Sequence, residues 1–497
     1  MLFHIKHSTF LPYYYRVYRN MKTFEKKVCE VQHATSLDER MKLAIAAVEY
    51  AVYHPTGYYA SPEIEGVFLE AAQLIPEVKC SPQKGTILHV LTQSYASGGH
   101  SRVVQRWIDM SDSKEGHSIV LLNQKNEIEP EWLKAAVDRH NGKMIRFEEP
   151  NIMKRAAKLR QLAADFERVI LHTHMDDPTA LIAFGVESFT TPILLFNHAD
   201  HLFWLGVSIS DMVADMHYDH ISYTRRNVAR SYTLGIPCAP SEFAQMDKKE
   251  ELRKELGIDA DAFVLLSVGN DHKYAKLGSK GLCSMIEKVV QQNAKVLCYA
   301  IGPDMSNNDW RKGYEETKGK IKPLGVIGDK ERYRMYLQAA DLYLGSFPFP
   351  GYTAMMDAVQ CGLPYLQLMV SRQQQSILLL EPNIDQSKCI CYSENELVTS
   401  IKAVMNDKQN YNSLYDECSL WAEGYSNQDR WKNRLYDMYT VCPTKHVIYK
   451  FDIKRGDQAF IEDADVLLGF LYSKTEIEPK SKMLRRLFHM YLRIKGV

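Results

Sequence analysis

Residues Ala340 to Leu366 read A-D-L-Y-L-G-S-F-P-F-P-G-Y-T-A-M-M-D-A-V-Q-C-G-L-P-Y-L. The segment Asp341 to Leu344 predicts a short apolar strand, and Tyr352 to Cys361 has the composition of a helix. Gly362 is a typical helix stop, and a second strand begins directly after it. The stretch therefore predicts strand, turn, helix and strand, the pattern of a parallel α/β sheet.

The entry to this helix is its chemically informative part. Gly351, Tyr352 and Thr353 would leave backbone N–H groups without helical partners, at an end that carries roughly half a positive charge. Such an end holds phosphate well. Asp357, further along the helix, could accept hydrogen bonds from ribose hydroxyls. On this stretch alone, an ordinary crossover helix explains the residues as well as a phosphate site does.

The stretch belongs to the second of two α/β runs, which follow one another without a repeat in sequence. The segment Gly235–Ser241 is the expected linker between them. Helices are expected after it at Lys248–Leu256, Lys280–Gln291, Asn308–Lys318 and Lys330–Ala339. Strands are expected at Phe263–Val268, Lys295–Ile301, Ile321–Val326, Asp341–Leu344 and Pro364–Leu368.

The first run opens with a strand at Thr86–Gln93, a glycine loop at Ser94–His100 and a helix at Ser101–Met110. This order is typical of nucleotide-binding α/β domains, although the loop lacks the GxGxxG spacing. Further helices are expected at Met153–Glu167 and Pro178–Glu187. Further strands are expected at Ser118–Leu122, Lys143–Phe147, Arg168–His172, Ile193–Asn197 and His220–Tyr223.

We therefore predict an α/β chain with two doubly wound, Rossmann-like domains that face an interdomain cleft. The expected divisions are a helical N-terminal extension (1–84), a first domain (85–240), a second domain (241–425), a helix that crosses back to the first domain (426–441) and a C-terminal extension (442–497). Helices at Arg40–Val52 and Glu63–Leu74 make up the N-terminal extension. Terminal helices are expected at Glu394–Met405, Gln409–Ala422 and Gln428–Tyr439, with Gly424–Asn427 capping the last.

Composition excludes several classes. The chain has 61 basic and 61 acidic residues, whereas a nucleic-acid-binding surface needs a clustered basic excess. The N-terminal residues contain no apolar core of a signal peptide, and no apolar run reaches bilayer length, so we expect a cytoplasmic protein. The ten cysteines are scattered without a CxxC pair, which favours reduced thiols over zinc or disulfides.

The last helix, Lys480–Lys495, is amphipathic. Its apolar face carries Met483, Leu484, Leu487, Phe488, Tyr491 and Ile494, and its basic face carries Lys482, Arg485, Arg486, His489 and Arg493. Docking on the protein core and peripheral contact with the inner face of a membrane both remain open.

The second α/β run resembles the nucleotide-sugar domain of GT-B glycosyltransferases. Val326 to Leu366 is similar, without gaps, to the donor segment of O-linked N-acetylglucosamine transferases and their bacterial relatives. The resemblance implies that Gly351, Tyr352 and Thr353 hold a diphosphate and Asp357 holds the ribose. Two departures are Ala354, where the family has a second Thr, and Tyr333, where it has a base-contacting His.

The same resemblance suggests further groups for the sugar donor. Gly269 and Asn270 follow the strand Phe263–Val268 and resemble a family glycine-asparagine turn. Lys276 resembles that family's phosphate-binding lysine, whereas Lys280 resembles the lysine of the retaining family 4-like enzymes typified by sucrose synthase. One of the two lysines is expected to reach the leaving diphosphate.

The first run resembles the acceptor-side domain of the same fold. Gly98, Gly99 and His100 lie in the glycine loop, and His174 closes an H-T-H segment at a strand end. The segment Ser426–Tyr439 resembles the helix that crosses back between the domains of GT-B enzymes.

A histidine is the expected base that deprotonates the acceptor hydroxyl. His198, Asp200 and His201 follow a strand, and in an extended segment Asp200 shares a face with His198 and could orient a histidine. His174 and His100 are second choices. A structural hydrogen bond at a strand end is the competing interpretation for each single histidine.

The resemblance implies a metal-independent hexosyl- or N-acetylhexosaminyltransferase. It would move a sugar from a nucleotide sugar, expected to be UDP-linked, to a hydroxyl of a glycan, lipid-linked or protein acceptor, as in polysaccharide biosynthesis. No cofactor, metal or nucleic-acid partner is expected, and no DxD motif stands at a strand end. The alternatives are an inactive GT-B binding subunit, a protein O-glycosyltransferase and a sugar-nucleotide epimerase.

Overall fold

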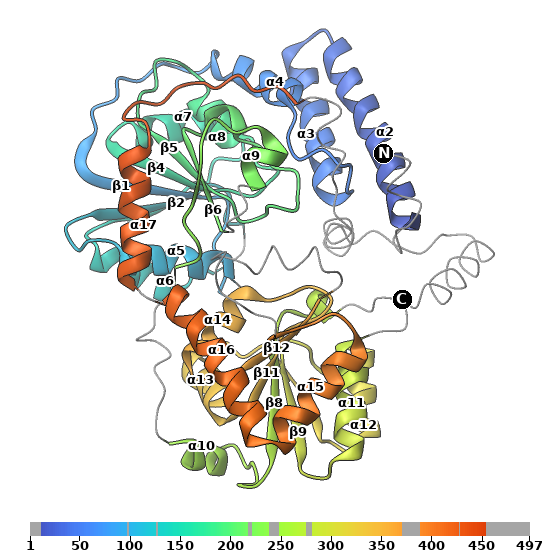
Figure 1. Cartoon of the computed structure of the whole chain (residues 1–497). Helices are drawn as coiled ribbons and strands as arrows, with labels where there is room; N and C mark the ends of the chain where they lie inside the picture. Colours follow the sequence, from blue (N-terminus) through green and yellow to red (C-terminus); the bar gives the residue numbers. More distant parts are fainter. Residues whose placement is uncertain are drawn as a thin grey trace. The chain divides into compact units, whose positions relative to one another are not determined.

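The computed structural model describes residues 11–96, 99–125, 128–216, 221–237, 248–274, 281–369, 388–426 and 428–453. The chain divides into two compact units. Of the described residues, unit 1 comprises those from 11 to 237 and from 429 to 453, and unit 2 comprises those from 248 to 428. Figure 1 colours the chain from end to end and labels the helices and strands.

Unit 1 is built on a seven-stranded parallel sheet with the order β3-β2-β1-β4-β5-β6-β7. Strand order reverses between β1 and β4, which marks the switch point where open α/β sheets bind ligands. The strands are β1 (Gln83–Leu91), β2 (Gly116–Leu121), β3 (Met144–Arg146), β4 (Phe166–His172), β5 (Ile193–Phe196), β6 (Met212–Asp215) and β7 (Ser231–Thr233).

Helices cover both faces of this sheet, as its continuous apolar strands require. They are α5 (Gly99–Met110), α6 (Glu131–Arg139), α7 (Ile152–Ala163), α8 (Thr179–Phe184) and α9 (Ile221–Arg226), with the short 3-10 helix η1 (Val207–Ile209).

The N-terminal helices belong to the same core. They are α2 (Leu11–His33), α3 (Leu37–Tyr53) and α4 (Pro62–Ala72). Phe24, Val48 and Phe68 from these helices share one buried cluster with Leu88 and Leu171 of the sheet. Arg160 of α7 is fully buried and donates to backbone carbonyls at the end of α4, directly after α4 and in α8, which fixes the helical layer to α7 and α8.

Unit 2 repeats the arrangement with a six-stranded parallel sheet, in the order β10-β9-β8-β11-β12-β13. Its switch point lies between β8 and β11. The strands are β8 (Phe263–Val268), β9 (Val296–Ile301), β10 (Ile321–Gly325), β11 (Leu342–Leu344), β12 (Tyr365–Leu368) and β13 (Ile390–Cys391). The helices are α10 (Lys249–Glu255), α11 (Leu282–Gln292), α12 (Asn308–Glu316), α13 (Lys330–Ala339), α14 (Tyr352–Gln360), α15 (Glu394–Asn406) and α16 (Lys408–Ser426), with the 3-10 helix η3 (Asp271–Tyr274).

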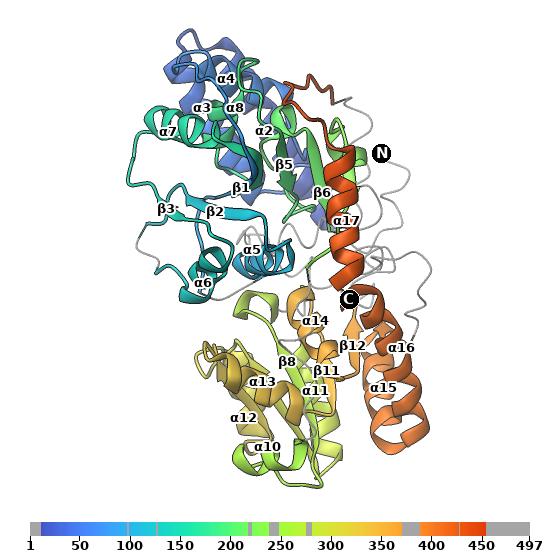
Figure 2. The same ribbon diagram turned by 90° about the vertical axis from the view of Figure 1, so that its left-hand side faces the viewer.

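Helix α17 (Gln428–Val441) belongs to unit 1, although it follows unit 2 in sequence. Trp431 packs edge-on against Trp107 of α5, with ring centroids 5.6 Å apart. Arg434 donates to the carbonyl of Leu234 directly after β7. Figure 2 shows α17 running beside the strands of unit 1.

The structure corrects two sequence expectations. Of the segment predicted as a strand at His220–Tyr223, residues 221–223 begin α9 instead, and His220 lies outside the described residues. The neighbouring strands are β6 and β7. Gly424–Asn427 was expected to separate two helices, whereas α16 continues to Ser426. The predicted amphipathic helix at Lys480–Lys495 lies outside the described residues.

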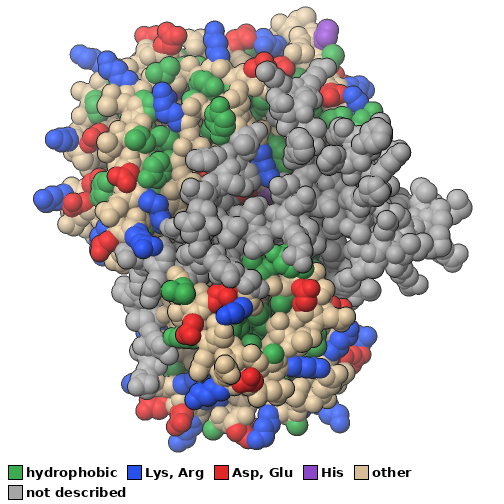
Figure 3. All heavy atoms as spheres, viewed as in Figure 1, with side chains coloured by type: hydrophobic (Ala, Val, Ile, Leu, Met, Phe, Trp, Pro, Cys, Tyr) green, Lys and Arg blue, Asp and Glu red, His purple; other side chains and the backbone are tan. Residues whose placement is uncertain are grey.

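The surface agrees with the balanced composition. On the face in Figure 3, acidic and basic side chains are interspersed over the coloured parts of both units. Among the helices of the described part, none has both the length and the hydropathy needed to cross a bilayer.

Candidate active-site residues in the two units

The turn before α14 lies at the switch point of the unit 2 sheet. It follows β11, and Gly269 follows the neighbouring strand β8. The two segments approach closely, since a Cβ atom added to Gly269 would lie 3.2 Å from Ser346. A Cβ atom on Gly351 would lie 3.3 Å from the Ser346 Oγ and 3.4 Å from the carbonyl of Val268. Glycine at both positions therefore keeps the space in front of the helix open.

Helix α14 begins at Tyr352 without a side-chain cap, because Gly351 occupies the N-cap position. Its first-turn N–H groups, which include those of Tyr352 and Thr353, retain the partial positive charge of a helix start. Both side chains are partly buried, as is Ala354. The turn has the chemistry expected of an anion site.

Lys273 supplies a full positive charge at the same turn. It lies in η3 after β8, and its Nζ donates to the carbonyl of Pro350 at 3.3 Å. The Nζ also lies 5.1 Å from the centre of the Phe349 ring and would be 3.6 Å from a Cβ atom on Gly351. Burial lowers the pKa of Lys273 from 10.5 to about 8. A bound anion would stabilise the charged form of this desolvated amine.

Lys273 was not among the predicted donor-binding residues. The lysines predicted from the family resemblance, Lys276 and Lys280, both lie outside the described residues. The sequence offers Lys273 as a candidate through the segment G-N-D-H-K (269–273), because this lysine is the fifth residue after the end of β8. Asn270 is exposed, and its carbonyl accepts from the backbone N–H of Lys273 at 2.9 Å.

Asp357 and Tyr333 form a pair beside the turn. The Tyr333 hydroxyl donates to the Asp357 Oδ2 at 3.3 Å, from α13 to α14. Asp357 is buried, with 6% of its surface exposed. Its negative charge raises the pKa of the Cys361 thiol to about 12, after the larger effect of burial. Tyr333 thus orients Asp357, the residue predicted to bind the ribose. The family resemblance suggests a different role for position 333, contact with the base.

Three histidines lie together at the switch point of unit 1. His100 is the second residue of α5, His174 follows β4, and His198 follows β5. The ring centroids of His100 and His198 are 4.3 Å apart, and those of His100 and His174 are 6.0 Å apart. Gly99 begins α5 in this cluster, whereas Gly98 lies outside the described residues.

Each of the three rings is held by a different partner. The His100 Nε2 is 3.0 Å from the carbonyl of His172, and the His174 Nε2 is 3.0 Å from the Tyr95 hydroxyl. The His198 Nε2 is 3.0 Å from the His172 Nδ1. Burial lowers the pKa of His100 to about 4 and that of His198 well below 6.5, so these rings are neutral at neutral pH.

Asp200 contacts a histidine of the loop after β5. Its Oδ1 lies 3.3 Å from the Nδ1 of its neighbour His201. The backbone of this loop is held by Arg226, which is fully buried and donates to the carbonyls of Asp200 at 3.0 Å and of Leu202 at 2.5 Å. His201 and Asp200 therefore form their own pair, and His198 takes its partner from β4.

Asp177 has a structural role, as its place before Pro178 suggests. Its Oδ1 accepts from the Thr179 backbone N–H at 3.0 Å, at the start of α8. Its Oδ2 accepts from the Thr92 hydroxyl at 2.7 Å. Within the described ranges, no group of three or more His, Cys, Asp and Glu side chains has an arrangement that could hold a metal ion.

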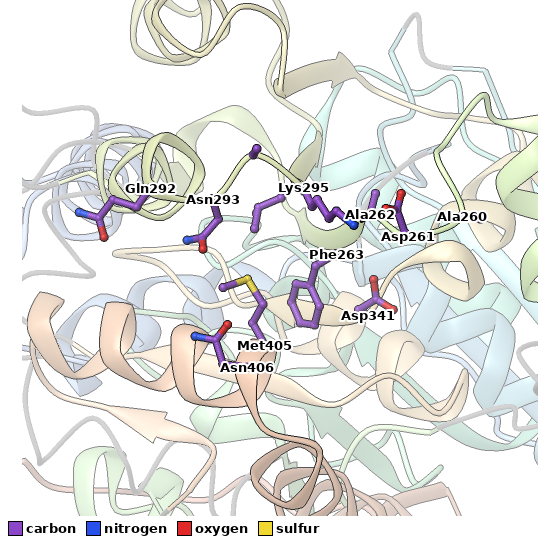
Figure 4. A pocket seen from close by; sticks show the side chains of 12 residues that line it. Ala260, Asp261, Ala262, Phe263, Gln292, Asn293, Lys295, Asp341, Met405 and Asn406 are labelled. Carbon is purple, nitrogen blue, oxygen red and sulfur yellow. Dashed lines mark hydrogen bonds and ion pairs between the residues drawn. The ribbon is translucent and has the colours of Figure 1, made fainter.

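Two pockets are relevant to the candidate site. One beside His198, also lined by His174, Asn197 and Trp204, measures about 20 Å³, which is room for one water molecule. The other, in unit 2, measures about 480 Å³ (Figure 4). It lies at the amino ends of β8 and β9, the edge opposite the switch-point loops, and Figure 4 shows Phe263 and Met405 beside one another in its middle. Both acids that line it are in ion pairs: Asp341 accepts from Lys249 and Arg253 at 2.7 and 2.5 Å, and Asp261 pairs with Lys295.

Comparison with known proteins identifies the fold. No family model matches the chain, and no curated protein matches it. Solved structures do match. HepE from Anabaena, in complex with UDP and glucose, has a TM-score of 0.54 at 14% identity over 71% of this chain and 99% of that chain. The O-GlcNAc transferase of Thermobaculum terrenum has a TM-score of 0.50 at 12% identity over 85% and 81%. The sucrose-phosphate synthase of Thermosynechococcus elongatus has a TM-score of 0.50 at 13% identity over 71% and 98%.

These structures are GT-B glycosyltransferases, so the chain has the GT-B fold of two Rossmann-like units. The predicted fold class is confirmed, and so is the resemblance at the level of the fold.

Proposed function

We propose that the protein is a glycosyltransferase that moves a sugar from a nucleotide sugar, UDP-linked, to a hydroxyl acceptor. The observation that carries the proposal is that an uncapped helix start and the partly buried Lys273 amine lie together at the unit 2 switch point. Both favour a diphosphate, one through backbone N–H groups and the other through a full charge. The GT-B fold supports the same reading, because HepE has that fold and was solved with UDP and with UDP-glucose.

The sugar donor would bind through unit 2. The first-turn N–H groups at Tyr352 and Thr353 would bind the diphosphate together with Lys273, and Asp357 would bind the ribose hydroxyls. In the transfer step the anomeric carbon–oxygen bond breaks and the diphosphate leaves with added negative charge. Preorganised N–H groups and a cation stabilise that charge, and one such group contributes about 3 kcal/mol to a barrier.

The acceptor would be activated through unit 1. His198 is a neutral imidazole, so it can take the hydroxyl proton while the acceptor oxygen bonds to the anomeric carbon. Asp200 with His201, and His100 with His174, are the alternative bases nearby. The acceptor class, which would be a glycan, a lipid-linked saccharide or a protein, is best sought by direct assay.

Nucleotide release tests this proposal. The purified protein is incubated with UDP-, GDP- and ADP-linked sugars and a mixed set of hydroxyl acceptors, and free nucleotide is measured. We expect release from a UDP-sugar only, and His198→Gln should reduce turnover at least about 100-fold while the affinity for UDP is retained. Asp357→Asn should instead weaken UDP binding, and Asp261→Asn, an exposed ion-pair residue of unit 2, is its matched control.

The outcomes separate the candidate functions. Binding of UDP without release from any sugar would favour a GT-B binding subunit. Isomerised sugar without transfer would favour an epimerase. Absence of UDP binding in calorimetry would contradict the donor site itself.

A further inference from the structure

A row of buried histidines crosses the sheet of unit 1 and ends at His198. The His117 Nδ1 lies 2.9 Å from the His89 Nε2, and the His89 Nδ1 lies 3.1 Å from the His172 Nε2. The His172 Nδ1 lies 3.0 Å from the His198 Nε2. At the far end, the His117 Nε2 lies 3.6 Å from the Glu115 Oε2. We call these five side chains the histidine row.

Strand register explains why the row exists. His117 of β2 stands opposite Ile87 of β1, two residues before His89, and His172 of β4 stands opposite Leu91, two residues after it. Positions two apart on a strand share a face, so the rings all lie on one side of the sheet. Each step to the next strand also moves two residues toward the carboxyl edge, where His198 lies. The row is therefore a diagonal line through the sheet to the switch-point edge.

The bonding pattern has one direction. Each neutral imidazole has one N–H donor and one acceptor nitrogen, and His89 and His172 use both nitrogens within the row. All of the bonds must therefore point the same way. The Glu115 carboxylate lies 3.6 Å from the His117 Nε2, slightly beyond hydrogen-bond distance, and its charge favours the direction in which His117 presents its Nε2–H toward it. Proton transfer to Glu115 requires this distance to shorten. Each ring then donates from Nε2, and the Nδ1 of His198 carries a lone pair.

The surroundings disfavour a charge on any ring of the row. His89, His117 and His172 are fully buried, and Trp107 of α5 lies edge-on to His89 and His172 at 6.0 and 5.7 Å. Burial lowers the pKa of all four rings, those of His89, His172 and His198 well below 6.5. A proton that enters the row is therefore not stored on an imidazole. The Glu115 side chain is 16% exposed and is the one carboxylate at the end of the row.

We propose that Glu115, His117, His89 and His172 form a proton relay that holds His198 as the Nε2–H tautomer and takes up the proton that His198 receives at Nδ1. The relay rests on the proposed function for the source of that proton. The four residues act through His198 and are positioning residues.

The proton steps balance along the row. The acceptor hydroxyl gives its proton to His198 Nδ1, and the His198 Nε2 proton moves to His172 Nδ1. The His172 Nε2 proton moves to His89 Nδ1, the His89 Nε2 proton to His117 Nδ1, and the His117 Nε2 proton to Glu115. Every ring is neutral before and after, and the carboxylate becomes a carboxylic acid. The same shifts in reverse return the proton through His198 to water after the product has left.

Other titratable groups face the row. His140, which follows α6, lies against the His117 ring at 5.3 Å, and Tyr436 of α17 donates to the Glu115 Oε2 at 3.3 Å. Tyr439 of α17 lies close enough for Glu115 to raise the pKa of its hydroxyl, after the larger effect of burial. His100 and His174 face His198 and lower its pKa further. None of these groups replaces a link in the row.

Tautomers test the relay without any assay of transfer. Nitrogen-15 NMR of the full-length protein with labelled histidine distinguishes Nε2–H from Nδ1–H rings, and single His→Gln variants assign the signals. We expect Nε2–H for His117, His89, His172 and His198 at pH 7. An Nδ1–H tautomer at His198 would overturn the relay, even if transfer is observed.

Kinetics test the uptake of the proton. Glu115→Gln keeps the size of the side chain and removes the proton acceptor, so we expect kcat to fall at least about 10-fold with KM unchanged. The pH profile of kcat should also change, because the proton no longer reaches a carboxylate. The control is His446→Gln, which disturbs a buried histidine of unit 1 that bonds to Asp211 at 2.9 Å and lies outside the row. We expect that variant to change stability and to keep both kcat and its pH profile.

A second variant keeps the relay testable if Glu115→Gln fails to fold. His89→Met fills the buried site without a proton-carrying group and should reproduce the effect of Glu115→Gln. If both variants keep the wild-type kcat and pH profile, the relay is contradicted. If no sugar transfer is found at all, the proposed function fails, whereas the tautomer measurement still decides the hydrogen-bonding pattern.

Discussion

Lys273→Met is expected to stabilise the fold and to weaken UDP binding. The ordinary pKa of this lysine is 10.5, and burial lowers it to about 8. A difference of this size corresponds to about 3 kcal/mol against the charged form. Because the side chain is partly exposed, we take about 1–3 kcal/mol as the cost in the folded state.

The direction in which stability changes with pH follows from proton binding in the folded and unfolded states. Between pH 8 and 10.5 the unfolded chain holds the proton of Lys273 and the folded chain loses it. Stability from this group therefore rises with pH through that window, and at pH 7 the folded state carries the full cost of the charge. Methionine keeps most of the packing and has no charge. The melting temperature of the variant at pH 7 should rise by about 2–4 °C for each kcal/mol relieved.

Loss of the Lys273 charge is also the reason why the Lys273→Met variant should bind UDP more weakly. A charge-assisted hydrogen bond contributes about 1.5–3 kcal/mol, so the dissociation constant for UDP should rise about 10- to 100-fold in calorimetry. In the wild type, affinity for UDP should also decline above about pH 8, where Lys273 begins to lose its proton. Lys273→Arg should remove this pH dependence, because arginine stays charged.

Lys322→Met is the matched control. It lies in β10 of the same unit with its Nζ 5.4 Å from the centre of the Tyr299 ring, away from the α14 turn. This variant should leave UDP affinity unchanged. If Lys273→Met binds UDP as tightly as the wild type, then Lys273 is not a diphosphate ligand.

Further substitutions probe the donor pair and the buried arginines. Tyr333→Phe removes the hydroxyl that bonds to Asp357, and the dissociation constant for UDP should rise about 5-fold in calorimetry; an unchanged value would show that this bond is not needed for ribose binding. Arg226→Met removes the donor to the Leu202 carbonyl and one of the two donors to the Asp200 carbonyl, and should destabilise unit 1 by about 3 kcal/mol in denaturant unfolding. A loss under 1 kcal/mol, about the level of a surface substitution, would contradict its anchoring role. Arg160→Met should lower stability by a similar amount, and faster proteolysis within α2 to α4 would mark the helical layer as the part released, whereas unchanged proteolysis there would argue against it.

Local patterns predicted the long elements well. Phe263–Val268 and Lys330–Ala339 have the predicted bounds, the first because it is a continuous apolar run and the second because Asp329 caps it. The strands β6 and β7, of four and three residues, were not predicted; β5 and β11 are equally short, but their sequences I-L-L-F and L-Y-L are wholly apolar. Residues 221–223 were taken for part of a strand, although Arg225 and Arg226 suit the last turn of the helix to which they belong.

The site was predictable only where it is contiguous in sequence. Gly351 to Asp357 could be assigned from one helix entry. The histidine row could not, because His89 and His117 are 28 residues apart, His89 and His172 are 83 apart, and strand register alone brings their rings together. His89 and His117 also resemble ordinary strand residues in the sequence. Lys273 was missed for a related reason, since its place beside Pro350 depends on the pairing of β8 with β11.

A structure with bound UDP would test the central claim most directly, because that claim places the nucleotide in unit 2. We expect the diphosphate oxygens within hydrogen-bond distance, about 3 Å, of the Tyr352 or Thr353 backbone N–H and of the Lys273 Nζ, with the ribose on Asp357. UDP bound elsewhere, or a diphosphate that contacts neither the α14 turn nor Lys273, would contradict the account.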